Sequence, residues 1–216
     1  MTDKEEFVPP KIVTAGIDDA GAVALTLKHA FFDADLAPWL VNDAVERDRI
    51  YPGYFEMLVE HAMEHGTVEW TADGSGAAIW YEVEGEPLPG LPGYSGRLAG
   101  ITAPFTARFV ALDEAQSAHH PYSRPHHYLA LLGVPPGMQS CGYGGHLLRH
   151  HHEQLDEKSI PAYLEATGAR NQGLYSRHGY RPHRKPYEIA SQGPVLHPMW
   201  REPNAMFPPG VGPRRD

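Results

Sequence analysis

The chain has 216 residues, of which 42% are hydrophobic and 21% are charged, so it can form one domain with a buried core and is not disordered throughout. The formal net charge is −9, and no cluster of Lys and Arg is present that could bind nucleic acid or an anionic membrane surface. These features argue against both partner classes and favour a cationic ligand.

A single cysteine, Cys141, cannot form an intramolecular disulfide, which suits a reducing compartment. The first ten residues are polar and acidic, without the basic start and apolar run of a signal peptide. No stretch of the chain reaches the length of a membrane span. We therefore expect a cytoplasmic protein.

The first half of the chain mixes predicted helices with predicted strands. Apolar residues recur at helical spacing after Asp18 or Asp19, either of which can cap a helix, and again before Gly66, which is placed to end one. Asp73-Gly74 is a hairpin signal between two strand-like runs. The predicted elements are a strand over 11–15, helices over 20–31 and 54–63, and hairpin strands over 67–71 and 76–83.

A stretch rich in Gly and Pro follows, from residue 84 to residue 104. It predicts a long loop, and a loop of this length in a compact domain is usually functional or mobile. Spaced apolar residues after it predict a helix over 105–112. We expect this loop and the two preceding helices to shape the specificity of the protein.

The second half of the chain is more regular. A nearly continuous apolar run over 127–134 predicts a strand buried on both faces. The elements predicted after it are a turn over 135–140, helices over 143–157 and 171–178, and strands over 162–166, 180–189 and 195–201. Residues 204–216 are predicted to form a disordered tail behind a single domain over 1–203. This order of elements predicts an α/β fold with a mixed sheet.

The strongest local signal is a glycine-rich loop between the strand over 127–134 and the next helix. The loop consists of Gln139, Ser140, Cys141, Gly142, Tyr143, Gly144 and Gly145. Glycines let the backbone approach a ligand closely, and the N–H groups and dipole at the start of a helix favour an anion. The loop therefore predicts a phosphate-binding site.

Two common phosphate-binding motifs do not fit this loop. Gly137 and Gly142 have the spacing of a P-loop, but Tyr143 stands where that motif requires Lys. Leu147 occupies the last glycine position of the dinucleotide-binding motif. The remaining pattern, a Gln followed by two spaced glycines, does not by itself distinguish a ligand-binding loop from a glycine-rich turn.

The segments around the loop resemble the acetyl-CoA motif of the GNAT superfamily of N-acetyltransferases, and within it the puromycin N-acetyltransferase-like branch. The resemblance covers about residues 125–180. It rests on the run HYLALLGV over 127–134, the pattern Gln139-x-x-Gly142-x-Gly144, the run PAYLEAT over 161–167 and the run NQGLYSRHGY over 171–180. Ser140 and Cys141 depart from the family, which often has a basic residue or a glycine there, and this departure implies weaker affinity for the coenzyme.

The resemblance implies a GNAT fold, a mixed and mostly antiparallel central sheet flanked by helices. It also implies that acetyl-CoA lies between two splayed strands, those over 127–134 and 162–166. The pantetheine arm is expected at the backbone of Leu132, Gly133 and Val134 and at Asn171, and the pyrophosphate on the loop over 139–145. Acetyl-CoA is the cosubstrate that we expect, with no metal ion.

Acetyl transfer requires a neutral amine and a proton for the departing thiolate of CoA. The resemblance implies that Tyr175 points at the thioester sulfur, which makes its phenol the candidate general acid; the alternative is a packing role for Tyr175. Glu165 is our candidate general base, because an acid within an apolar strand is costly unless it is paired or functional. A structural carboxylate is the alternative for Glu165. The other candidate bases are His119, His120, His126 and Glu82.

The expected acceptor is a primary amine of a small molecule, a metabolite or an antibiotic, with a peptide N-terminus or a lysine as the second choice. The candidate acceptor-binding residues are Phe31, Asp33, Tyr81 and His126. Aromatic rings and a carboxylate suit a cationic amine. We expect the protein to be a monomer or a homodimer.

Two other functional classes remain open. A non-catalytic acyl-CoA-binding module would keep the glycine loop but would not need the two candidate catalytic residues. The chain has 14 histidines, and His146, His150 and His151 on one predicted helix raise the hypothesis of a metalloenzyme. His152-Glu153, however, lacks the later histidine of a zinc-protease motif.

Overall fold

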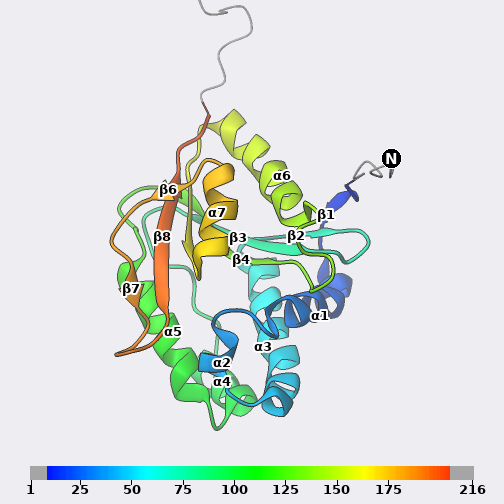
Figure 1. The fold of residues 1–216 in the computed structure, drawn as a ribbon, viewed down its shortest axis with the longest axis vertical. Coiled ribbons are helices and arrows are strands. Elements are labelled where there is room, and N and C mark those ends of the chain that lie inside the picture. Colours follow the sequence, from blue (N-terminus) through cyan, green and yellow to red (C-terminus); the bar gives the residue numbers. More distant parts are fainter. Residues whose placement is uncertain (1–8, 205–216) are drawn as a thin grey trace, which may run out of the picture.

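The structure, a computed structural model, describes residues 9–204. An eight-stranded sheet crosses the middle of the molecule, and helices lie on both of its sides (Figure 1). The strands are β1 (Ile12–Thr14), β2 (Thr67–Thr71), β3 (Ala77–Val83), β4 (His126–Gly133), β5 (Ala162–Ala166), β6 (Arg181–Pro182), β7 (Tyr187–Glu188) and β8 (Val195–Arg201). The helices are α1 (Ala20–Phe31), α2 (Ala37–Leu40), α3 (Ala44–His65), α4 (Tyr94–Thr102), α5 (Thr106–His119), α6 (Tyr143–Lys158) and α7 (Ala169–Arg177), with a 3-10 turn η1 (Ile17–Asp19) before α1.

The sheet is mixed and mostly antiparallel, which confirms the prediction from the sequence. Its strand order is β1-β2-β3-β4-β5-β8-β6, with β7 beside β8, and among the strands of residues 9–204 only β4 and β5 run parallel to each other. The predicted hairpin joins β2 to β3, where Gly74 has a φ of 73° and the backbone N–H of Ser75 donates to Asp73 at 3.0 Å.

Alternation along the strands divides the core into two parts, one on each face of the sheet. On β3, Ile79 and Tyr81 face the core beneath α1, α3 and α5, whereas Trp80 faces the core beneath α6. On β5, Tyr163 also belongs to the core on the α3 and α5 side. Because side chains two positions apart share a face, Glu165 lies on that side of the sheet as well.

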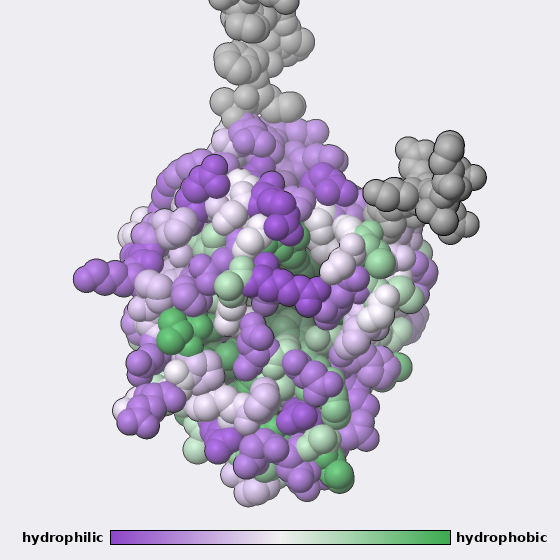
Figure 2. All heavy atoms as spheres, in the orientation of Figure 1, coloured by the Kyte–Doolittle hydropathy of each residue, from purple (hydrophilic) through white to green (hydrophobic). Residues whose placement is uncertain are grey.

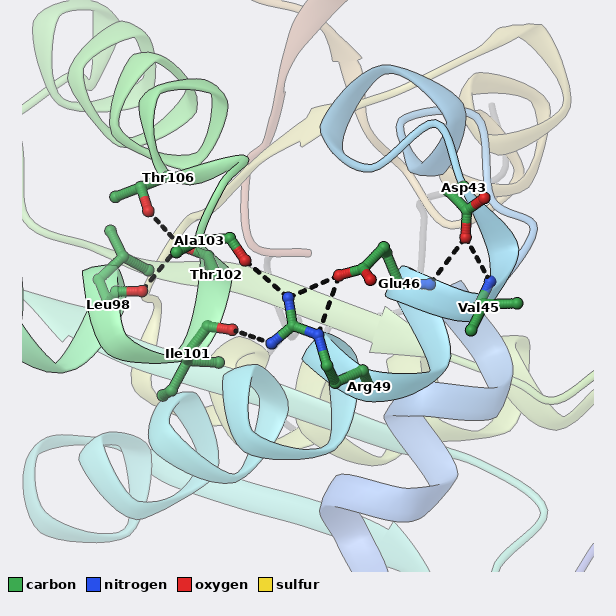
Figure 3. A network of polar contacts seen from close by, with 9 residues as sticks. All are labelled: Asp43, Val45, Glu46, Arg49, Leu98, Ile101, Thr102, Ala103 and Thr106. Carbon is green, nitrogen blue, oxygen red and sulfur yellow. Dashed lines mark hydrogen bonds and ion pairs between the residues drawn. The ribbon is translucent and has the colours of Figure 1, made fainter.

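Helix α3 is longer than predicted. It begins after Asp43, whose carboxylate accepts hydrogen bonds from the N–H groups of Val45 and Glu46 at 2.8 and 2.9 Å (Figure 3). The sequence-based prediction started only at Tyr54, because Pro52 inside a helix normally argues for a break. The additional turns bring more of α3 against α4.

The stretch over 84–104 is not a loop throughout, so that prediction was wrong. Helix α4 occupies nine of these residues, and Leu98 within it is fully buried. Gly93 precedes the helix with a φ of 67°, a conformation that favours glycine. Helices α2 and α4 are short, and short helices owe their stability to tertiary packing rather than to local sequence, which is why both were missed.

The C-terminal strands differ from the prediction in one place. The predicted strand over 180–189 forms only the two-residue strands β6 and β7, because Pro182 and Pro186 cannot donate hydrogen bonds to a sheet. Asn204, predicted to begin a tail, donates its backbone N–H to Asp156 at 2.8 Å. The rest of the predicted tail lies outside the described residues.

Candidate active site

The parallel strands β4 and β5 separate along their length. Their pairing joins only His127 to Ala162 and Tyr128 to Tyr163, after which β4 continues to Gly133 while β5 pairs with β8. Backbone groups of a strand point alternately to its two sides. Beyond Tyr128, β4 therefore presents N–H and C=O groups to the gap between the strands.

The part of β4 beside this gap is less buried than predicted. Ala130, Leu131 and Leu132 are half-buried, because they line a cavity instead of a closed core. Pairing with β3 passes from Leu129 to Leu131, so that Ala130 forms a bulge. Bulges bend a strand and turn backbone groups away from the ladder, and they are frequent beside active sites.

The glycine-rich loop leads from β4 into the start of α6. Ser140 and Gly142 have left-handed backbones, with φ values of 65° and 96°, and Gly142 stands at the N-cap position without a side chain to cap the helix. The side chain of Gln139 donates to the carbonyl of Val134 at 3.0 Å and ties the loop to the end of β4. The start of α6 thus faces the cavity with backbone N–H groups and a positive helix dipole, which suits an anion.

One cavity of about 1100 Å³ connects this loop with the space between α3, α4 and α5. On the face shown in Figure 2 the surface is hollowed near its centre, with apolar atoms inside the hollow and polar atoms around it. We call one end the loop half, lined by Leu132, Gly133, Val134, Gln139, Ser140, Gly142, Tyr143, Gly144, Gly145, Arg149, Arg170, Asn171, Tyr175 and Arg177. We call the other end the helix half, lined by Phe31, Asp33, Tyr51, Tyr54, Phe55, His61, Tyr81, Tyr94, Asp113, Gln116, His120, Tyr128 and Glu165.

Ten of the eleven residues predicted to bind the coenzyme line the loop half. The exception is Cys141, which is exposed and lies outside the cavity lining, with its thiol directed to the carbonyl of Gln139 at 3.6 Å. Asn171 lines the cavity and donates from its side chain to Thr167 at 2.9 Å. The coenzyme roles of these residues remain predictions.

Three arginines that the sequence analysis did not consider line the loop half. They are Arg149, Arg170 and Arg177, and Arg170 donates to the hydroxyl of Ser140 at 3.2 Å. Among the described residues that line the cavity, these three are the only Arg or Lys. For Arg149 the sequence did contain a signal. It lies four residues after Gly145 on the predicted helix, and residues at that spacing share a helix face. The loop half is therefore positively charged although the chain as a whole is acidic.

Tyr175 on α7 is half-buried and lines the loop half beside the gap. Its ring packs edge-on against Tyr180, with the ring centroids 5.8 Å apart. Burial raises the pKa of Tyr175 well above its usual range, so the phenol keeps its proton at neutral pH. Tyr175 thus packs against Tyr180 and also lines the cavity, and its role as general acid stays a prediction.

Glu165 on β5 lines the cavity and accepts hydrogen bonds from three tyrosines. Tyr163 and Tyr187 donate to Oε1 at 2.7 and 3.3 Å, and Tyr128 donates to Oε2 at 2.9 Å. Burial raises the pKa of Glu165, and the phenol hydrogen bonds act in the opposite direction. Three phenols leave Oε2 with capacity for one further donor, so the carboxylate is both structurally held and open to a ligand.

Of the alternative bases, only His120 lines the cavity. His126, which we predicted to bind the acceptor, is instead buried behind His120 and does not line the cavity. Nδ1 of His126 donates to the carbonyl of Arg124 at 2.7 Å, so its Nε2 accepts from Nε2 of His120 at 3.1 Å. This leaves Nδ1 of His120 as an acceptor, and burial lowers the pKa of His120 to about 3. His119 and Glu82 lie outside the cavity lining.

The other predicted acceptor-binding residues lie in the helix half. Phe31 and Tyr81 form part of its aromatic wall, and Asp33 lies at its edge, 3.4 Å from Arg47. His61 connects this wall to the segment before α4, because it donates from Nε2 to the carbonyl of Pro89 at 2.8 Å. Its Nδ1 then accepts from the hydroxyl of Tyr81 at 2.7 Å.

A further cavity carboxylate, Asp113 on α5, was missed by the sequence analysis. The hydroxyl of Tyr94 on α4 donates to its Oδ2 at 2.5 Å. Burial raises the pKa of Asp113 to about 6, and the hydrogen bond from Tyr94 opposes this rise. The predicted helix ended at Leu112 and Tyr94 was assigned to a loop, so no local pattern brought the two residues together.

Within residues 9–204, no group of three or more His, Cys, Asp or Glu side chains is placed to hold a metal ion. His146 and His151, considered above as metal ligands, contact the carbonyl of Pro10 at 2.9 Å and the carboxylate of Glu69 at 3.0 Å. None of the helices in the described part of the chain has the length and apolar character needed to cross a membrane.

Solved structures of acetyltransferases share this architecture. A protein described as histone acetyltransferase HPA2 and related acetyltransferase, from Corynebacterium glutamicum, matches with a TM-score of 0.70 and 22% identity over 94% of this chain and 100% of its own. Arylalkylamine N-acetyltransferase 2 from Aedes aegypti matches with a TM-score of 0.63 and 17% identity over 90% of this chain and 99% of its own. A ribosomal-protein-alanine N-acetyltransferase from Escherichia coli matches with a TM-score of 0.52 and 14% identity over 94% and 98%.

No protein-family model matches the chain. The structural similarities establish that it has the GNAT fold, as the resemblance in its sequence implied. The separating strands β4 and β5 and the start of α6 therefore belong to a fold that other proteins use for acetyl transfer.

Proposed function

We propose that this chain, which has the fold of the GNAT acetyltransferases, is an N-acetyltransferase that moves the acetyl group of acetyl-CoA to a primary amine of a small molecule. One observation carries the proposal. A single cavity joins the positively charged start of a helix to an acidic, aromatic chamber, and residues of β4 and β5 line it. An anionic coenzyme and a cationic amine suit the opposite ends of such a cavity.

In this proposal, the loop half holds acetyl-CoA. The backbone at the start of α6, together with Arg149 and Arg170, offers donors and positive charge to phosphate groups. The edge of β4 beside the gap and the side chain of Asn171 suit the amide groups of the pantetheine arm. When bound, the coenzyme supplies an activated acetyl thioester.

The chain's own residues then manage two protons. The acceptor must lose a proton before its nitrogen lone pair can form the new N–C bond, and Glu165 is the group assigned to accept that proton, directly or through water. After the N–C bond forms, the nitrogen loses its second proton to solvent. As the C–S bond breaks, the phenol of Tyr175 donates a proton to the sulfur and regains one from solvent, so the overall transfer releases one proton. In this proposal, backbone N–H groups of β4 near the bulge stabilise negative charge on the carbonyl oxygen.

The test measures binding and turnover separately. Calorimetry on the purified protein should detect saturable binding of CoA and acetyl-CoA, and thiol release should depend on an added small amine and persist in EDTA. Because charge-assisted contacts contribute about 1.5–3 kcal/mol, Arg170→Gln should weaken CoA binding about tenfold or more. Arg181→Gln, an exposed arginine outside the cavity lining, is the matched control.

Each negative result points to a different error. Absence of coenzyme binding would overturn the proposal altogether. Binding without turnover of any amine would identify a non-catalytic acyl-CoA module, and turnover of peptides alone would replace the small-molecule acceptor by a protein. Loss of turnover in EDTA would favour the metalloenzyme.

A further inference from the structure

The helix half contains a carboxylate that the proposed chemistry at Glu165 does not use. We propose that Asp113, held by Tyr94, binds a second cationic group of the acceptor, so that the acceptor is an alkyl diamine or polyamine acetylated at one end. This inference rests on the proposed function, because it names the substrate class of the same site.

The distribution of charge in the cavity calls for more than one cation. Four carboxylates line the cavity, and three of them, Asp33, Asp113 and Glu165, belong to the helix half, whereas the arginines that line the cavity belong to the loop half. The fourth, Asp35, accepts from the hydroxyl of Thr167 at 3.4 Å. Asp33 already has a positive partner, Arg47, at 3.4 Å. A monoamine at Glu165 would leave Asp113 without a counter-charge, and a partly buried carboxylate without one is costly.

Asp113 has unused capacity to accept hydrogen bonds. Its Oδ2 accepts from Tyr94, and its Oδ1 has no hydrogen bond to another residue of the described chain. Glu165, in contrast, accepts from three phenols. An ionised carboxylate can accept about four hydrogen bonds, so Asp113 has room for the three donors of an ammonium group.

The surroundings of Asp113 are aromatic. Tyr51, Tyr54 and Phe55 from α3 line the cavity together with Tyr94. The ring of Tyr54 is fixed between Phe55 and Phe109, at centroid distances of 5.4 and 4.7 Å. Aromatic faces attract alkyl ammonium groups, and a rigid aromatic wall next to a carboxylate selects a cation over a neutral polar group.

A chain of contacts fixes the separation of the two carboxylates. Asp113 and Gln116 lie one helical turn apart on α5, and the side-chain amide of Gln116 donates to the hydroxyl of Tyr128 at 3.2 Å. Tyr128 in turn donates to Glu165 at 2.9 Å. One turn separates side chains by roughly 5–6 Å, so the carboxylates are on the order of 10 Å apart, a span that a flexible alkyl diamine can bridge.

Helix α4 is held firmly, which keeps Tyr94 opposite Asp113. Arg49 on α3 donates to the carbonyls of Ile101 and Ala103 at 3.4 and 2.6 Å, at the corner between α4 and α5 (Figure 3). At the same corner, the hydroxyl of Thr102 bonds the carbonyl of Leu98 at 2.7 Å. A fixed corner provides the preorganised geometry that a specificity site needs.

The experiment compares a terminal alkyl diamine with the alkyl monoamine of the same chain length. The wild-type protein should have the higher kcat/KM for the diamine. Asp113→Asn should raise KM for the diamine about tenfold, the effect of losing one charge-assisted contact, and so reduce the ratio of kcat/KM for the diamine to kcat/KM for the monoamine. Glu157→Gln, which removes an equal charge from an exposed residue of α6 outside the cavity lining, should behave like the wild type. Tyr94→Phe keeps the carboxylate and should reduce the preference less than Asp113→Asn does.

Calorimetric titration of both amines into the protein saturated with CoA provides a readout without turnover. Equal affinity for diamine and monoamine, or an unchanged preference in Asp113→Asn, would overturn the diamine site while leaving the acetyltransferase proposal intact. A different outcome would overturn the acetyltransferase proposal and leave the cation site standing. In that outcome the protein neither binds the coenzyme nor turns over an amine, but it binds the diamine more tightly than the monoamine, and Asp113→Asn abolishes this difference.

Discussion

At the scale of single residues, Tyr175 is the sharpest test of the proposed mechanism. Tyr175→Phe removes the phenol proton but keeps the ring that packs on Tyr180. Because general acid catalysis contributes about 10²–10⁴-fold, kcat should fall by about 10²-fold or more, while calorimetric affinity for acetyl-CoA stays nearly unchanged.

Tyr180→Phe is the matched control for that substitution. Tyr180 lies next to Tyr175 but outside the cavity lining, and its hydroxyl bonds His152 at 3.1 Å. The Tyr180→Phe substitution should lower the free energy of unfolding modestly and leave the kcat of the folded protein intact. A Tyr175→Phe protein with wild-type turnover would remove Tyr175 from the mechanism.

At the scale of elements, the position of α4 depends on its contacts with α3. Arg49 is half-exposed and donates to the carbonyls of Ile101 and Ala103 at the C-terminal end of α4, where carbonyl groups lack partners within the helix (Figure 3). Arg49→Met keeps the alkyl stem and removes the donors. Since a net hydrogen bond contributes about 0.5–1.5 kcal/mol, we expect a loss of about 1–2 kcal/mol in the free energy of unfolding, together with a higher KM for the amine and unchanged CoA affinity.

The control for this element is an ion pair remote from α4. Arg124→Met removes the exposed pair with Glu202, whose atoms lie 2.7 Å apart, and should leave the KM for the amine as it is. Equal amine KM values for Arg49→Met and the wild type would show that the α3–α4 contact does not position the helix half.

At the scale of the whole molecule, buried histidines predict acid sensitivity. Burial lowers the pKa of His120 and His152 to about 3 and that of His127 to about 4. The unfolded chain binds these protons at an ordinary pKa of about 6.5, so stability is complete above that pH and is lost as the pH falls toward 4. The raised pKa values of Asp113, about 6, and of Glu165 act in the opposite direction, whereas the lowered pKa values of His126, His178 and His183 add to the effect.

The measurement is thermal unfolding as a function of pH. With each of the three histidines costing about 1–2 kcal/mol at pH 5, and each kcal/mol lowering Tm by about 2–4 °C, these histidines alone should make Tm about 6–24 °C lower at pH 5 than at pH 7. His152→Gln can keep a hydrogen bond to Tyr180 and should make this dependence shallower. A Tm that does not change between pH 7 and pH 5 would contradict the assignment of these histidines as neutral.

Local sequence patterns determined most of the elements that hold the loop half. The hairpin at Asp73-Gly74, the apolar run of β4 and the glycine-rich entry to α6 each carry their signal within a few consecutive residues, because backbone geometry there depends on glycine and on apolar spacing. The same kind of pattern failed for α3 and α4. Pro52 argued against a helix over the first turns of α3, and α4 is stabilised by tertiary packing rather than by a local sequence pattern.

The sequence by itself therefore determined the fold class and the candidate anion site, whereas the tertiary structure alone decided the acceptor side. Asp113 and Tyr94 meet only because α4 packs on α3 and α5, and His126 is buried behind His120 instead of facing the cavity. The physical reason is the range of the interactions. A loop conformation follows from neighbours in the chain, but the direction in which a side chain faces follows from the packing of elements that are far apart in it.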